Sequence, residues 1–155
     1  SGSTTVFPNA PPNGIYARLT WDTPHADLDL HLVDLTRGGV FYTPPFDCYF
    51  ANPSPNWGVP GSADDPSLGI DDIEGYGPED IRFDLPAVGL YRVYTHVYQI
   101  NEDPSPSARI ELVLDGSLVL DRTMVLNSNG LVWDVANIDW TARTVTEIGT
   151  TWIGP

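Results

Sequence analysis

The stretch GIYARLTWD, residues 14–22, alternates apolar and polar side chains. Its apolar members are Ile15, Ala17, Leu19 and Trp21. Successive side chains of an extended strand point to opposite faces, so all four fall on one face and the polar residues between them fall on the other. The stretch therefore predicts a half-buried β-strand.

The same period of two returns along the rest of the chain. The segment DLDLHLVDL, residues 27–35, places Leu28, Leu30 and Leu32 on one face. A turn at 36–39 and a short run at 40–42 follow it, which predicts a hairpin. Further strands are expected at residues 47–51, 81–85, 90–100, 108–115, 117–126, 131–140 and 144–148.

Helix signals are nearly absent from this chain. The 15 Pro and 14 Gly interrupt it so often that no stretch keeps a 3.6-residue apolar period over three turns. Short strands separated by Gly, Pro and Asn turns are typical of a sandwich rather than of a parallel sheet with crossover helices. We therefore expect an all-β fold, an antiparallel two-sheet β-sandwich with a jelly-roll-like layout. Its predicted buried residues are Trp21, Leu28, Leu30, Leu32, Val93, Leu112 and Trp133.

One domain is the expected organisation. A chain of 155 residues has the usual size of one domain, and no shift in composition marks a second. Residues 1–13 are interpreted as a cloning remnant at Ser1-Gly2 followed by an N-terminal linker, and residues 14–155 as the β-sandwich. Residues 52–80 carry no predicted strand and are rich in Pro, Gly, Asp and Ser. They are expected to form one long acidic loop over one end or edge of the sandwich.

The charge of the chain limits its partners. The net charge is −14, Lys is absent, and seven Arg are scattered among 21 acidic residues. Phosphate backbones and anionic membranes require clustered basic residues, so neither nucleic acid nor such a membrane is an expected partner. No apolar run reaches the roughly 20 residues that cross a bilayer, so no membrane insertion is expected. Such acidity fits either a protein that binds divalent cations or a surface adapted to salt.

Two acidic clusters point toward calcium. Asp27, Asp29 and His31 share the strand face opposite the leucines. Carboxylates this close repel each other unless a cation lies between them, and the alternative is a solvated outer face of an edge strand. The second cluster alternates acids and glycines over residues 64–80. A Gly-rich turn lets backbone carbonyls bend toward calcium. The residue order of an EF-hand calcium loop is missing here, and the alternative for this cluster is a solvent-exposed acidic loop.

These motifs occur in an order that resembles the YfaP-like family of bacterial exported domains. The segments that carry the resemblance are Trp21-Asp22, DLDLHL at 27–32, YFANP at 49–53, Asp71-Asp72, GYGPE at 75–79 and GLYRV at 89–93. The layout is also similar to bacterial pre-peptidase C-terminal domains, which are calcium-associated β-sandwiches. The resemblance covers about residues 15–100 and implies an accessory module of a larger multidomain chain. It implies an extracellular or cell-surface location, with the periplasm as the alternative.

The resemblance also implies a ligand set for the ion. The carboxylates that occur in the same order as in the family pattern are Asp27, Asp29, Asp71, Asp72 and Glu79. Asn52 is expected as an additional amide ligand. His31 is expected beside the ligands rather than on the ion, because neutral imidazole suits zinc or iron better than calcium.

The predicted function is a non-catalytic extracellular binding or structural module that calcium stabilises. The alternative is a carbohydrate-binding module, because exposed aromatic side chains on a rigid scaffold suit contact with a glycan or a cell-surface protein. The candidate contacts are Trp57, Tyr76 and Tyr49. Trp57 also fits a loop anchor packed on the sandwich.

Catalysis is the less favoured function, and we expect no catalytic residue. A metal-dependent hydrolase would need His25, His31 and His96 to converge with an acid, and the chain has no HExxH motif. Cys48 cannot form an internal disulfide, because it is the one cysteine, and it is interpreted as a small core residue.

Overall fold

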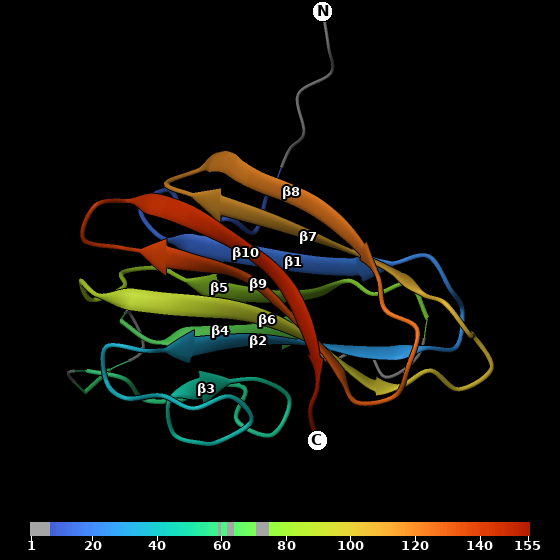
Figure 1. Cartoon of the computed structure of the whole chain (residues 1–155). Helices are drawn as coiled ribbons and strands as arrows, with labels where there is room; N and C mark the ends of the chain where they lie inside the picture. The colour runs from blue at the N-terminus through green and yellow to red at the C-terminus, as the bar shows by residue number, and fades with distance from the viewer. Residues whose placement is uncertain (1–6, 59, 62–63, 71–74) are drawn as a thin grey trace, which may run out of the picture.

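Two antiparallel five-stranded sheets pack face to face in the computed structural model (Figure 1), which describes residues 7–58, 60–61, 64–70 and 75–155. This arrangement confirms the predicted all-β sandwich. The described residues contain no helix, and so none that is long and apolar enough to cross a membrane.

The first sheet has the strand order β4-β5-β1-β7-β8. Its strands are β4 (Pro66–Ile70), β5 (Glu79–Phe83), β1 (Ile15–Trp21), β7 (Ser107–Leu114) and β8 (Ser117–Val125). The second sheet has the order β10-β9-β6-β2-β3. Its strands are β10 (Thr144–Ile153), β9 (Leu131–Asp139), β6 (Leu90–Gln99), β2 (Asp27–Asp34) and β3 (Asp47–Cys48). The consecutive strands β1 and β2 belong to different sheets, so residues 22–26 carry the chain from one sheet to the other.

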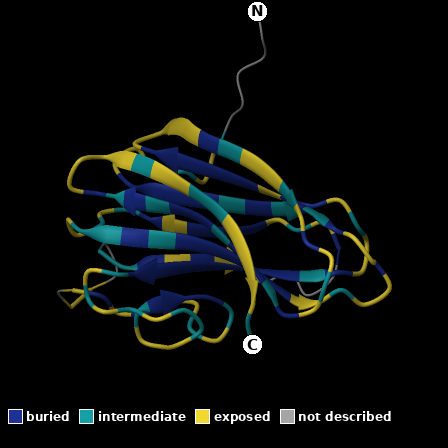
Figure 2. Cartoon of the chain, in the orientation of Figure 1, coloured by how far each residue is buried: buried dark blue, intermediate teal, exposed yellow. Residues whose placement is uncertain are grey.

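The core lies between the two sheets (Figure 2). β10 has no fully buried side chain, whereas β2 is buried on both of its faces. All seven residues predicted to be buried lie in this core, and so does Cys48. Leu28, Leu30 and Leu32 are completely buried, as the period of two predicts. Full burial of such a side chain stabilises the fold by about 1.5–3 kcal/mol.

The interval 52–80 is not one long loop, which corrects the expectation from the sequence. Residues Pro66–Ile70 form β4, which pairs with β5 at the edge of the first sheet. Pro66 lowers the strand signal because it has no N–H to donate, and proline is tolerated where a strand lies at an edge.

The segment at 40–42 is not the second strand of a hairpin, because it packs on a sheet face instead of pairing at an edge. Phe41 lies on the outer face of the second sheet, with its ring centroid 4.8 Å from that of Tyr94 and 5.7 Å from that of Trp152. It joins a small apolar cluster around Val33, Tyr94 and Val132. The partner of β2 on this side is β3, at Leu32 and Val33.

The last strand, β10, is longer than the expected run at 144–148, since it extends to Ile153. Its register against β9 shifts between Glu147 and Thr150, where Gly149 has a φ of 75°. This irregularity interrupts the alternation that marks the other strands in the sequence.

Candidate metal centre

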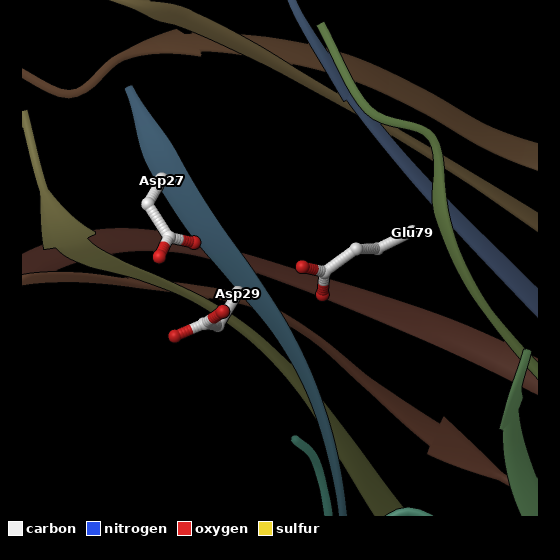
Figure 3. Close-up of side chains that lie close together, drawn as sticks. All are labelled: Asp27, Asp29 and Glu79. Carbon is white, nitrogen blue, oxygen red and sulfur yellow. The ribbon is translucent and has the colours of Figure 1, made fainter. Parts of the chain in front are cut away.

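Three acidic side chains converge beside the first half of β2 (Figure 3). One carboxylate oxygen from each of Asp27, Asp29 and Glu79 lies within 4.8 Å of the other two. Asp27 and Asp29 extend from β2 in the second sheet, whereas Glu79 extends from β5 in the first. Asp29 and Glu79 are buried, and Asp27 is partly exposed. Three of the five predicted carboxylates therefore meet, and Asp71 and Asp72 lie outside the described residues.

Glu79 reaches across the sandwich to the backbone of β2. Its Oε1 accepts a hydrogen bond of 3.0 Å from the N–H of Leu30. Since the N–H and C=O of one residue in an antiparallel strand point to the same side, and alternate residues share that side, the carbonyls of Leu28 and Leu30 also face this edge. The edge therefore offers backbone carbonyl oxygens beside the three carboxylates.

The GYGP block before Glu79 is held against the turn between β1 and β2. Gly75, Tyr76 and Gly77 have φ angles of 70°, 66° and 78°. A Cβ atom on Gly75 would lie 2.3 Å from the carbonyl oxygen of Pro24, so this approach requires glycine. The backbone hydrogen bonds are Gly75 N–H to Ala26 O, Tyr76 N–H to Thr23 O and Trp21 N–H to Tyr76 O, at 3.1, 2.9 and 3.0 Å. These contacts fix where β5 begins and direct Glu79 toward β2.

Asp103 holds the same turn from the other side, a role that no motif in the sequence indicates. Its Oδ2 accepts hydrogen bonds from the N–H groups of His25 and Ala26, the two residues before Asp27. Asn101 donates its side-chain N–H to the carbonyl of His25 at 2.6 Å. Asp103 follows β6 and lies 77 residues from Ala26 along the chain, so no local pattern connects them.

Replacing Asp103 by Asn is expected to destabilise the protein near neutral pH. Burial acts to raise the pKa of Asp103, but the hydrogen bonds from His25 and Ala26 outweigh it and the net pKa is lowered. A carboxyl whose folded pKa lies below its unfolded value of about 3.9 stabilises the fold above that value and loses this contribution as the pH falls through the folded pKa. The urea midpoint of Asp103→Asn should therefore lie below that of wild type at pH 7, and the two should approach each other at low pH.

The matched control for this variant is Glu102→Gln. It removes the same charge from the adjacent side chain, which is 83% exposed. Its urea midpoint should stay near that of wild type. A difference between Asp103→Asn and wild type that does not change with pH would contradict the assigned role of the Asp103 charge.

His31 does not lie in solvent beside the acids. It is completely buried, and its Nδ1 lies 2.6 Å from Oδ2 of Asp47, which also accepts the N–H of Tyr42 at 2.7 Å. Burial raises the pKa of Asp47, although the charge and hydrogen bond of His31 act to lower it. The ring of His31 stacks on Tyr49 at 4.7 Å. The pair therefore holds the segment from Tyr42 to Tyr49 over β2, a role that no motif in the sequence indicates.

The three histidines do not converge on one site. His31 and His96 lie edge to face with their ring centroids 6.1 Å apart, whereas His25 contacts Asp103 instead. Burial lowers the pKa of His96 to about 4, and its Nε2 lies 3.0 Å from the carbonyl of Pro155. In the part of the chain that the structure describes, the compact group of possible metal ligands contains carboxylates and no histidine.

The predicted aromatic contacts differ in exposure. Trp57 is 1% exposed; it packs against Phe83 and Tyr91 and donates its Nε1–H to the carbonyl of Pro45 at 2.7 Å. This placement matches a loop anchor. Tyr49 is also buried, so neither ring presents a face to solvent, whereas Tyr76 is 57% exposed.

Asn52 helps to fasten the loop that carries Tyr49. Its Nδ2 donates to the carbonyls of Pro45 and Asp47 at 3.1 and 3.0 Å. The amide nitrogen of Asn52 therefore makes these two hydrogen bonds within its own loop.

Comparison with known proteins gives no match to a family model, a curated protein or a solved structure. The resemblance to the YfaP-like family accordingly stays a prediction.

Proposed function

We propose that this chain is a non-catalytic extracellular or cell-surface module that calcium stabilises. The observation that carries the proposal is the convergence of Asp27, Asp29 and Glu79 from two different sheets. An ion held by all three would connect the two sheets at this end of β2. The proposed ligand set also includes Asp71 and Asp72, which precede Glu79 in the chain.

The donor set fits calcium. Calcium takes roughly six to eight oxygen ligands from carboxylates, carbonyls and water, and this edge of β2 offers carboxylate and carbonyl oxygens. Two like charges 4.8 Å apart repel by roughly 1 kcal/mol in water and roughly 3 kcal/mol in the less polar surroundings of a protein surface. A divalent cation turns this repulsion into attraction. Magnesium fits less well, because it demands a tight octahedron and gives up its water reluctantly.

The burial of the reactive side chains supports a module without catalysis. Cys48 is completely buried, and burial raises the pKa of its thiol, so the thiolate that acts as a nucleophile is disfavoured. His31 is also completely buried and contacts Asp47. Neither side chain is open to a substrate in solution.

Titration calorimetry with calcium tests this proposal directly. Wild type should show saturable heat with calcium and affinity at least about tenfold lower for magnesium. Glu79→Gln should lose most of the calcium affinity, because it removes one charged ligand while its amide oxygen still accepts the N–H of Leu30. The control Glu147→Gln removes the same charge from β10 and should bind as wild type does. Absence of calcium heat in wild type, or unchanged affinity in Glu79→Gln, would exclude the site.

A further inference from the structure

An exposed aromatic ring lies next to the proposed metal centre. On β6, the side chains of Tyr94, His96 and Tyr98 alternate with the core residues on the outer face of the second sheet. Tyr94 and His96 are buried, but Tyr98 is 50% exposed. The register between β2 and β6 shifts where Asp27 pairs with Gln99 and Leu28 pairs with Val97. This bulge places Tyr98 opposite the start of β2, beside Asp27.

Two further aromatic residues connect Tyr98 to the acids. Phe50 is partly buried, and its ring centroid lies 5.7 Å from that of Tyr98 in an edge-to-face arrangement. Phe50 also packs against Tyr42 at 6.0 Å. Burial raises the pKa of Tyr42, and the nearby charges of Asp29 and Asp27 raise it further. The phenol of Tyr42 therefore lies within electrostatic range of the metal centre and in contact with the ring that supports Tyr98.

We propose that the calcium ion and Tyr98 together bind a neutral glycan, an inference that rests on the calcium site proposed above. Asp27 is the partly exposed member of the three acids, so an ion held beside it would lie at the solvent side of this cluster. Adjacent hydroxyls of a sugar supply the uncharged oxygen ligands that calcium accepts. The apolar face of the sugar ring then packs on Tyr98, with Phe50 holding that ring in place.

The charge of the protein selects a neutral ligand. With a net charge of −14 and no Lys, the chain repels acidic polymers over long range. A neutral polymer with many adjacent hydroxyl groups, such as mannan, avoids this repulsion. The glycan contact is thereby assigned to Tyr98 with Phe50, in place of the buried Trp57 and Tyr49.

Affinity electrophoresis in gels that contain mannan, with calcium or with chelator, tests the inference. Wild type should be retarded in calcium and released by chelator. Tyr98→Ala should weaken the retardation about tenfold, whereas Tyr98→Phe should keep it within about twofold, because the ring and not the hydroxyl makes the contact. The matched control is Trp152→Ala, which removes another exposed aromatic ring, 41% exposed, from β10 of the same sheet. This control should be retarded as wild type is.

Calcium titration of the same variants separates this inference from the proposed function. Tyr98→Ala should bind calcium as wild type does while it loses mannan. Calcium binding without calcium-dependent retardation by mannan overturns the glycan inference and leaves the metal site intact. Stronger retardation by polygalacturonate than by mannan overturns the neutral class of ligand. Absence of calcium binding in wild type overturns both proposals.

Discussion

Millimolar calcium is expected to raise the melting midpoint of the protein by about 5–10 °C, and excess chelator is expected to remove the rise. An ion that binds only the folded state stabilises it by RT ln(1 + [L]/Kd), about 2.7 kcal/mol when free calcium is 100 times Kd. Each kcal/mol moves the midpoint of a domain of this size by roughly 2–4 °C. Differential scanning calorimetry in calcium, magnesium and chelator measures the effect, and magnesium should give the smaller rise.

Substitution of the proposed ligands should separate the stabilising effect of calcium from the electrostatic effect of the acidic side chains alone. Asp27→Asn, Asp29→Asn and Glu79→Gln keep the shape of each side chain and withdraw one charge, so each variant should lose most of the calcium response. In chelator, each should melt at or above chelated wild type, because repulsion among the three carboxylates is relieved. Equal midpoints of wild type in calcium and in chelator would show that the three acids hold no calcium ion.

Trp57→Ala is expected to destabilise the protein strongly, more than replacement of any exposed side chain. Trp57 fills a space between Phe46, Phe83 and Tyr91 and is 1% exposed. Truncation of a buried aromatic side chain to alanine costs about 3–5 kcal/mol through lost burial and the cavity that remains. The melting midpoint should therefore fall by roughly 6–20 °C.

Two further variants show whether Trp57 acts as a core residue. Trp57→Phe keeps most of the apolar volume and loses the hydrogen bond to Pro45, so its midpoint should lie between those of wild type and Trp57→Ala. Trp152→Ala removes a tryptophan that is 41% exposed and should lower the midpoint less than Trp57→Ala does. An unchanged midpoint in Trp57→Ala, together with lost glycan binding, would instead identify Trp57 as a contact residue.

The sequence predicts the fold where the pattern is local. Alternation over residues 15–21 and 27–34 is visible within each strand's own sequence, so β1 and β2 could be placed directly, although the structure also buries the outer face of β2. β4 was missed because its proline and glycine weaken the strand signal, and such a short edge strand is defined by its pairing with β5. The sequence leaves Trp57 two roles, a buried loop anchor or a glycan contact, because a loop has no residue period that indicates whether a large aromatic side chain is buried.

The candidate site was only partly predictable for a related reason. Asp27 and Asp29 share a face by strand geometry, but the contact of Glu79 with Leu30 joins two sheets across 49 residues. Asp47 and Asp103 act through partners that are 16 and 77 residues away in the chain. Neither has a local pattern that distinguishes it from the other acidic residues of this chain.

The contact between Glu79 and Leu30 also bears on aggregation. An exposed strand edge with unpaired N–H groups is a template for a strand of another molecule. β3 pairs with β2 at Leu32 and Val33, and beyond that point the N–H of Leu30 is taken by a carboxylate that is fixed from the opposite sheet. A foreign strand would have to displace a charged acceptor and approach Asp27 and Asp29 at the same time. The arrangement that gathers these three carboxylates thus protects this edge of the sandwich against strand addition.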